Sequence, residues 1–538
     1  MFRHSPLPLM LAALGLSFAM SASAADLSKC TSCHGTIAKD HAGAAHKDVA
    51  CSTCHTGLDQ HLANMKTRPT VNFDPAACGA CHTDQYKSLF AAGERPPRQS
   101  KKDATGPGPD PFFDRAMGTH GFTKEHDLPR AHVFMAIDQF IVDRAFGGRF
   151  QPKDGWLYPT LEGGKSYKVW DVLKDNHPES NEHKIFKPGT AAAGNAVCWT
   201  CKSSDLMLDW AYMGDKVEGA KFHRGSNPVE VVRSVNHALN CNFCHDPHTT
   251  QPRIIRDALI DALDRDEKGP SVYRDQATNP AKLTVKEAGV RGFTRKIATM
   301  DRADSRLMCA QCHVEYAGNP GTTPDGKPVK MAESRLTNHF PWMNADDIEA
   351  HYQKIGFVDF VHPLTGAKLV KLQHPDVETY LGSTHDKAGA TCASCHMPKV
   401  KKADGTTYTN HWATSPRHYM KETCLACHTD KTEAQMNATI DAMHGYYTGK
   451  LREAESRMDD MFNAFELAIA MNVPEAKLDE ARKLHSTAHI NWEYWTAVNG
   501  AWFHNPDMAV RSLEKCAKAA QQAAKLLRDA AKEVNAKK

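Results

Sequence analysis

The sequence predicts a mainly α-helical fold with extensive loops and long C-terminal helices, and three observations support this prediction. Apolar residues recur with helical periodicity over residues 434–471, 479–499 and 507–536. Pro474 and the run His504-Asn505-Pro506 interrupt this periodicity, as expected where antiparallel helices are joined. Strand signals are few along the whole chain.

The recurring motif of the 538-residue chain is Cys-x-x-Cys-His, the attachment signature of c-type haem. Chance would place roughly 0.03 such motifs in a chain of this composition, and this chain has seven. Structural zinc, the main alternative, needs no histidine directly after the second cysteine. We therefore expect both thiols of each motif to bind a porphyrin covalently and its histidine to bind the iron. The seven motifs comprise Cys30, Cys33 and His34; Cys51, Cys54 and His55; Cys78, Cys81 and His82; Cys241, Cys244 and His245; Cys309, Cys312 and His313; Cys392, Cys395 and His396; and Cys424, Cys427 and His428.

An eighth motif, which joins Cys198 and Cys201, has Lys202 in the position of the histidine. An amine must lose its proton to bind iron, and it changes the electronic properties of the iron through the identity of the axial ligand. A haem that keeps one open face can bind a small molecule, so this exceptional haem is the candidate for catalysis. The alternative is that Lys202 is a solvated surface residue and that a remote histidine binds this iron.

The eight motifs use 16 of the 17 cysteines and leave only Cys516. We therefore predict eight covalently bound haem c groups, which crosslink the chain in place of disulfides. The formal net charge is +3, but a ferric haem with two ionised propionates adds about −1, so the loaded protein is expected to be acidic. No basic arm or aromatic ladder indicates a nucleic-acid partner.

The first 24 residues are typical of a secretory signal peptide, because a short apolar run leads to the small residues Ala22-Ser23-Ala24. Cleavage there predicts an exported, periplasmic protein, and an uncleaved membrane anchor is the alternative. Three motifs then crowd together before a Pro/Gly-rich stretch over residues 94–111. The predicted domains are a signal peptide (1–24), a three-haem domain (25–115) and a five-haem catalytic domain (116–538) that ends in long helices over about 434–538.

Taken together, these motifs resemble the cytochrome c nitrite reductases, which have a five-haem core with Cys-x-x-Cys-Lys at its first haem. The three extra N-terminal motifs resemble the octahaem branch of that family. The resemblance implies that Lys202, Arg144, Tyr316 and His374 are catalytic. In these roles Arg144 is a permanent cation, and His374 is a proton donor that titrates near neutrality.

Two further segments resemble the calcium site of that family, and calcium prefers oxygen ligands. The first contains Glu315 and Tyr316, which follow the motif of His313. The second contains Lys371 and Gln373. The resemblance implies that the Glu315 and Gln373 side chains and the Tyr316 and Lys371 carbonyls bind calcium.

The resemblance also implies the distal ligands of four haems. It pairs His132 with His313, His411 with His245, His504 with His396, and His385 with His428. For the first three haems we expect the distal ligands to come from a set of four, one of which is spare: His41, His46, His61 and His120.

The predicted function is the six-electron reduction of nitrite to ammonium, with hydroxylamine and sulfite as further substrates. The alternatives are a hydroxylamine-oxidising octahaem enzyme, which the lysine at position 202 opposes, and a non-enzymatic electron carrier. Tyr316-Ala317-Gly318 lacks the cysteine that some octahaem members crosslink to the catalytic tyrosine, so Tyr316 is expected to be unmodified. The expected partners are a periplasmic or membrane-associated electron donor and further copies of the chain, as a trimer, a hexamer or a dimer.

Overall fold

The structure, a computed structural model, describes residues 30–91, 111–117, 132, 196–227, 230–231, 234, 237–318, 320–323 and 327–537. The chain divides into two compact units, Met1–Asn72 and Phe73–Lys538. In the smaller unit, short helices surround the first two haem motifs, and one pair of two-residue strands is antiparallel. These elements are α2 (Gly35–Ala42), α3 (Cys51–Cys54), α4 (Leu58–Ala63), β1 (His55–Thr56) and β2 (Thr70–Val71).

The larger unit begins with short helices that are joined by loops. Several of them end at a haem motif, so the helices place the cysteines rather than build a conventional helical core. They are α5 (Pro75–Gly79), α6 (Thr83–Leu89), α7 (Pro111–Met117), α10 (Ser204–Asp209), α12 (Asp257–Asp266), α13 (Val272–Gln276), α14 (Ser305–Ala310), α15 (Ile348–Ile355), α16 (Asp376–Tyr380), α17 (Thr384–Lys387), α18 (Cys392–His396) and α19 (Cys424–Cys427), with 3₁₀ turns η6 (Ala196–Cys201), η7 (Tyr212–Gly214), η8 (Cys241–Phe243), η9 (Met331–Glu333) and η10 (Pro416–Tyr419).

The longest strands form a hairpin that the sequence did not single out. Strands β4 (Leu283–Val290) and β5 (Phe293–Met300) pair along their full length, and β3 (Arg253–Ile254) pairs with the other edge of β5. Arg291 and Gly292 join the hairpin with φ angles of 47° and 100°. Two positive φ angles are typical of the type I′ turn, whose twist matches that of the flanking strands. Two smaller antiparallel pairs are β6 (Phe360–Val361) with β7 (Lys368–Leu369) and β8 (Lys399–Lys401) with β9 (Thr407–Thr409).

The C-terminal part of the chain forms the predicted long helices, α20 (Glu433–Ala470), α21 (Glu475–Ala497) and α23 (Pro506–Ala536), with the short α22 (Ala501–His504) before the last. Local chemistry explains where they begin. Thr432 and Gln435 form a capping box at the start of α20. Pro474 precedes α21 directly, and Asn505 caps α23, whose first residue is a proline.

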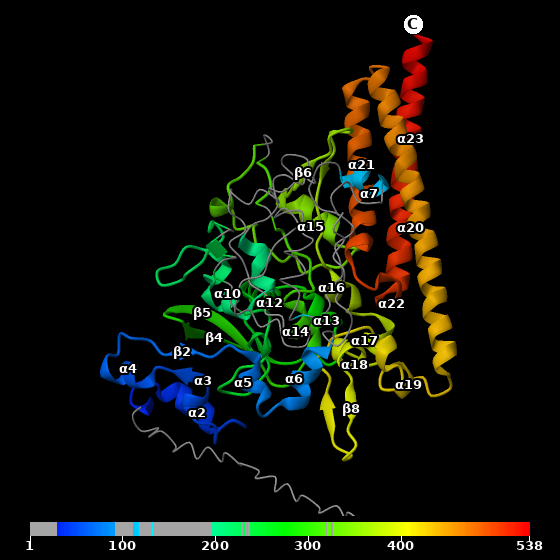
Figure 1. Cartoon of the computed structure of the whole chain (residues 1–538). Coiled ribbons are helices and arrows are strands. Elements are labelled where there is room, and N and C mark those ends of the chain that lie inside the picture. Colours follow the sequence, from blue (N-terminus) through cyan, green and yellow to red (C-terminus); the bar gives the residue numbers. More distant parts are fainter. Residues whose placement is uncertain are drawn as a thin grey trace, which may run out of the picture. The chain divides into compact units, whose positions relative to one another are not determined.

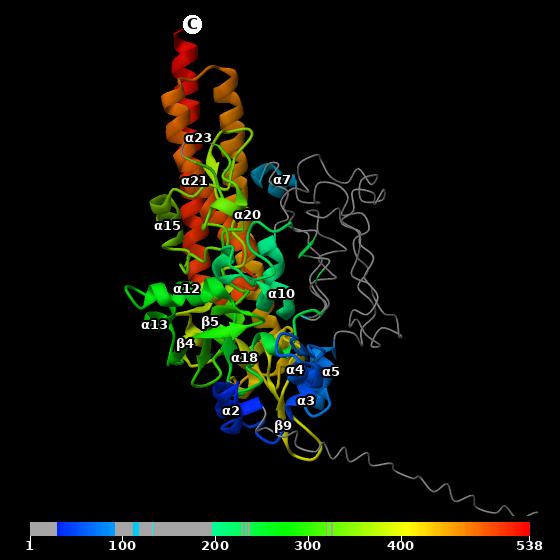
Figure 2. The ribbon, with the colours of Figure 1, turned by 90° about the vertical axis from the view of Figure 1, so that its left-hand side faces the viewer.

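These helices pack side by side, as two views turned by 90° show (Figures 1 and 2). Their shared interface is lined by alanine, leucine and aromatic side chains, and α7 and α15 pack onto the same core. Cys516 is fully buried in this interface. A second core surrounds α12, β5 and α14, next to the residues predicted to be catalytic.

The mainly α fold class with loops and long C-terminal helices is therefore confirmed. The predicted domain boundary near residue 115 stays a prediction; division by contacts places the third haem motif in the larger unit. The predicted signal peptide lies outside the described residues. None of the helices in the described part of the chain combines the length and the apolar character that a membrane span requires.

Candidate haem-linked active site

The haem motifs share one backbone arrangement. Two cysteines three positions apart on a helical turn project to the same side, as covalent attachment to one porphyrin requires. In six motifs the N–H of the histidine donates to the carbonyl of the first cysteine, one α-helical turn earlier: His34, His55, His82, His245, His313 and His428. Lys202 differs, because its N–H donates to the Trp199 carbonyl at 2.9 Å, in a tighter 3₁₀ turn.

Five motif histidines each face a second histidine across a similar gap. Two imidazoles on opposite faces of one metal ion, each bonded at about 2.0 Å, have ring centres about 6 Å apart. The ring centres of the five pairs lie between 6.1 and 6.4 Å apart: His34 with His61, His132 with His313, His245 with His411, His385 with His428, and His396 with His504. This spacing fits a planar group held between each pair.

The second ring nitrogen of several of these histidines is already bound. The Nδ1 atoms of His61, His396 and His411 lie 2.8, 2.9 and 2.8 Å from backbone carbonyls. A ligating histidine commonly donates its other N–H in this way, which fixes the ring and leaves Nε2 for the metal.

His313 is distinguished by a carboxylate partner. Its Nδ1 lies 2.9 Å from Asp376 Oδ2, and Asp376 Oδ1 accepts a hydrogen bond from the Asn499 N–H at 2.7 Å. Burial by itself lowers the pKa of His313, but the bond to Asp376 outweighs it and raises the pKa. Sequence analysis missed Asp376, because no spacing links it to a histidine 63 residues earlier.

We expect Asp376→Asn to raise the reduction potential of the haem held by His313. A carboxylate makes the imidazole more electron-donating and so favours ferric iron, whereas an amide lacks this charge. A loss of about 1.4 kcal/mol in the stabilisation of the ferric haem corresponds to a rise of about 60 mV in its one-electron reduction potential. A spectroscopic redox titration measures it. Thr414, whose backbone carbonyl is the partner of His396, provides the control, because Thr414→Ala should leave all potentials unchanged.

Tyr316 and His374 lie near the motif that ends at Lys202. The motif cysteines Cys198 and Cys201 affect the pKa of Tyr316, and Lys202 affects that of His374. Burial raises the pKa of Tyr316 well above its usual value, so the phenol keeps its proton. The structure therefore brings two of the predicted catalytic side chains to the exceptional motif.

His374 is neutral in this environment, which differs from the titration near neutrality that its residue type suggests. Protein atoms surround His374, although its side chain keeps solvent-accessible surface. Burial lowers the pKa of His374 to about 3. The nearby charges of Lys202 and His313 also lower this pKa, and Lys202 has the larger effect of the two. A neutral imidazole still offers one N–H donor and one acceptor.

Glu315 anchors the second feature of the site. Its carboxylate is fully buried and accepts hydrogen bonds from the Tyr352 hydroxyl at 2.8 Å and from the Gln373 N–H at 2.6 Å. The two segments predicted to bind calcium therefore meet at this carboxylate. The Lys371 ammonium group lies 3.1 Å from Glu493 Oε1, so its side chain is engaged elsewhere, as expected if its carbonyl is the ligand.

The charge balance around Glu315 fits a bound cation. Burial raises the pKa of Glu315 to about 8, although its hydrogen bonds to Gln373 and Tyr352 and the charge of Lys371 lower it. Oε2 of the neighbouring Glu378 is also buried without a hydrogen-bond partner. Among the described residues, no three His, Cys, Asp or Glu side chains converge on a metal site, so a cation here relies on Glu315 with carbonyl and amide oxygens.

Cysteines from different motifs also touch one another. Within the smaller unit, the thiol of Cys30 lies close to that of Cys51 and helps to raise its pKa. The larger unit has three such contacts, Cys78 with Cys241, Cys201 with Cys312, and Cys309 with Cys392, and Cys395 lies close to Cys424. Each contact brings together the attachment points of two haems.

Two of the predicted site residues, Arg144 and His120, lie outside the described residues. Their roles stay predictions, as does the choice among His41, His46, His61 and His120 for the N-terminal haems.

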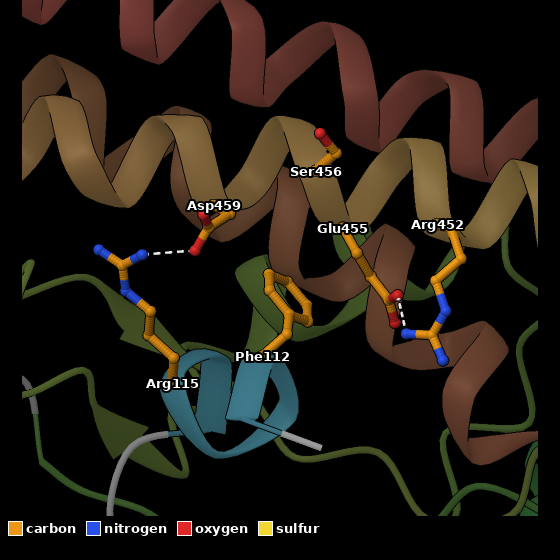
Figure 3. Close-up of a pocket in the computed structure, with 6 residues that line it drawn as sticks. All are labelled: Phe112, Arg115, Arg452, Glu455, Ser456 and Asp459. Atoms are coloured by element: carbon orange, nitrogen blue, oxygen red, sulfur yellow. Dashed lines mark hydrogen bonds and ion pairs between the residues drawn. The ribbon is translucent and has the colours of Figure 1, made fainter.

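A pocket of about 530 Å³ lies away from the predicted catalytic residues, between α7 and α20. Figure 3 shows Phe112 on α7 between two ion pairs, Arg115 with Asp459 and Arg452 with Glu455. The charged side chains Arg115, Asp459, Arg452 and Glu455 of this pocket are therefore paired with one another.

Several known proteins are similar to this chain in sequence or in structure. A model of the family described as Cytochrome c552 matches residues 155–538. A cytochrome c-552 from Haemophilus influenzae (strain 86-028NP) is 30% identical over 413 residues, which cover 74% of this chain and 63% of that protein. The chain thus spans less than two thirds of the length of that relative. A cytochrome c nitrite reductase subunit from Nitratidesulfovibrio vulgaris is 29% identical over 410 residues, which cover 70% of this chain and 68% of the relative.

Among solved structures, a cytochrome c nitrite reductase from Desulfovibrio desulfuricans superimposes with a TM-score of 0.57 at 25% identity. The alignment covers 85% of this chain and 86% of that one. The catalytic subunit of that enzyme is described with two calcium sites.

Proposed function

The chain belongs to the cytochrome c552 family, and from this premise we propose that it is an octahaem c-type cytochrome that reduces nitrite to ammonium. Membership of a cytochrome c family implies covalently bound haem c. The observation that carries the proposal is the single motif with Lys202, which has a 3₁₀ backbone and lies beside Tyr316 and His374. The nitrite reductases among the relatives support the choice of substrate.

Seven of the eight haems would transfer electrons, each with two histidine ligands and no open face. The ring pairs at 6.1–6.4 Å support five of these ligand pairs. Four of them coincide with the pairs that the family resemblance implies. The fifth supports His61, among the four candidates, as the distal ligand for the haem of His34.

Lys202 would be the proximal ligand of the catalytic haem. The overall reaction converts one nitrite, eight protons and six electrons into one ammonium ion and two water molecules. When bound, the haem supplies the electrons and an iron that holds nitrite through its nitrogen. The protein must bind an anion, keep partly reduced nitrogen species in place and deliver protons.

Three side chains would meet these needs. Arg144 provides a permanent cation for the anionic substrate. The Tyr316 hydroxyl keeps its proton and donates a hydrogen bond toward the substrate. The neutral His374 imidazole would donate a hydrogen bond through its N–H, and it would relay protons by accepting one from water at its other ring nitrogen as it gives up the first.

Calcium would bind at Glu315, with the Tyr316 and Lys371 carbonyls and the Gln373 side chain. There it would neutralise a buried carboxylate and hold the Tyr316 segment against the segment that carries His374. The hydrogen bond between the Gln373 N–H and Glu315 supports this arrangement, because it already joins the two segments.

The thiol contacts support an order for electron transfer within the larger unit. One branch would run from the haem of Cys78 to that of Cys241. The other would run from Cys424 through Cys395 to Cys392 and Cys309. The haem of Cys309 and Cys312 then adjoins the catalytic motif through Cys201.

We further propose a periplasmic location, a periplasmic or membrane-associated electron donor and a homo-oligomer.

A nitrite reduction assay tests the proposed function directly. The holoprotein is supplied with reduced methyl viologen and nitrite, and ammonium is measured. We expect six electrons to be consumed for each ammonium ion formed. A preparation with eight haems that forms no ammonium would contradict the proposal, and faster oxidation of hydroxylamine would favour the oxidising alternative.

A further inference from the structure

Gln311 occupies an unusual place among the haem motifs. It is the residue before Cys312 in its motif, and its side chain is fully buried. Its Oε1 atom accepts hydrogen bonds from the backbone N–H groups of Ile255 and Arg256, at 2.8 and 3.2 Å. A variable position in one motif is thus tied to a segment more than 50 residues earlier in the chain.

The amide nitrogen of Gln311 faces a different haem motif. Its Nε2 atom lies 3.4 Å from the carbonyls of Phe243 and Arg253 and 3.8 Å from the sulfur of Cys244. Two donors on one side of the amide and several acceptors on the other fix its orientation. Gln311 therefore joins its own motif to the motif of Cys241 and Cys244.

The motif of Cys198 and Cys201, which is predicted to be catalytic, also contacts Gln311. The sulfur of Cys201 lies 3.9 Å from the backbone carbonyl of Gln311, and the sulfur of Cys312 lies 3.9 Å from the backbone carbonyl of Cys201. Arg256, whose backbone is held by Gln311, donates through its guanidinium group to the Thr200 hydroxyl inside the catalytic motif. Three attachment segments thus meet at Gln311, the catalytic motif through the Gln311 backbone and through Arg256.

We propose that Gln311 is a positioning residue at the junction where both branches of electron transfer meet the catalytic haem. This inference rests on the proposed function, because it requires haem at the three motifs. Each transfer moves one electron, so a ferrous donor haem becomes ferric as a ferric acceptor becomes ferrous. Gln311 takes no part in the redox change; it fixes the spacing and orientation of the segments between which the electron moves.

The test uses Gln311→Met in the full-length holoprotein, because methionine keeps the volume and removes every hydrogen bond. Reduction by reduced methyl viologen is followed by stopped-flow absorbance without nitrite. We expect eight haems to remain, while reduction of the catalytic haem slows about 10-fold, the lower end of the effect of removing a group that orients a ligand. A redox titration should also show a changed potential for at least one of the three haems.

Ser394 provides the matched control, because it holds the same motif position before Cys395 but is exposed and hydrogen-bonded only to nearby Thr391. Ser394→Ala should reduce at the wild-type rate. Gln311→Glu, which keeps an acceptor for Ile255 and Arg256, should restore part of the lost rate. Wild-type kinetics and potentials in Gln311→Met would overturn the proposal.

Loss of haem from both Gln311 variants would also overturn it, because Gln311 would then be needed for assembly rather than for positioning. Failure of the proposed function gives a different result. If the wild type formed no ammonium, the reduction kinetics without nitrite would still measure the effect of Gln311.

Discussion

We expect Lys202→His to leave the haems attached and to lower nitrite turnover by about 10- to 100-fold, the range typical of changes in the immediate surroundings of a metal. Covalent attachment depends on Cys198 and Cys201, which the substitution does not touch. Turnover depends on the axial ligand, and an imidazole changes the electron donation to iron. Geometry adds to this effect, because the 3₁₀ turn at Lys202 differs from the α-helical turn at the motif histidines. A histidine at position 202 would therefore have a backbone geometry that differs from that of the other motif histidines.

The measurements are haem content, steady-state ammonium formation and the absorbance of the catalytic haem. Lys202→Arg provides a second variant, because it keeps a positive charge that cannot ligate iron. Lys421→His is the control, since Lys421 is an exposed lysine outside any motif. Unchanged turnover in Lys202→His would mean that the lysine is incidental and that this haem is not the catalytic one.

We expect Glu315→Gln to abolish the proposed calcium binding and to lower nitrite turnover by about 10- to 100-fold. Glutamine keeps the shape and an acceptor for the Tyr352 hydroxyl, but it removes the buried negative charge that a cation would neutralise. Without the cation, the Tyr316 and His374 segments lose a shared anchor. Turnover should fall more than substrate affinity, because geometry at the reacting atoms is disturbed.

Calcium content and thermal unfolding measure this effect separately from activity. In the wild type, free calcium at 100 times its Kd should add about 2.7 kcal/mol to the free energy of unfolding, and chelation should remove it. Glu315→Gln should be insensitive to both treatments. Glu455→Gln is the matched control, since Glu455 is also buried but lies in α20 beside Trp492. Calcium-dependent unfolding of Glu315→Gln would contradict the assignment.

Much of the fold was predictable because its determinants are local. Helical periodicity identified α20, α21 and α23, and Pro474 and Asn505-Pro506 marked their starts. The hairpin of β4 and β5 was not singled out. Its turn, Arg291-Gly292, is a weak signal, since arginine rarely adopts a positive φ.

The residues of the candidate site were likewise only partly predictable from the sequence. The covalent haem motifs, Lys202, Tyr316 and His374 were identified from short patterns and from the family resemblance. Asp376, Tyr352 and Gln311 were not, because each acts on a residue far along the chain. The neutral state of His374 was also unpredictable, since burial rather than residue type sets its pKa.

The sequence by itself determined what each haem motif contains, which motif is the exception and where the long helices lie. Each of these depends on residues within one or two helical turns, where spacing alone dictates geometry. Only the tertiary structure decided which histidines lie opposite each other and which cysteines are in contact. It also decided which carboxylate forms a hydrogen bond with His313. These contacts join segments tens to hundreds of residues apart, and only packing of the folded chain brings such segments together.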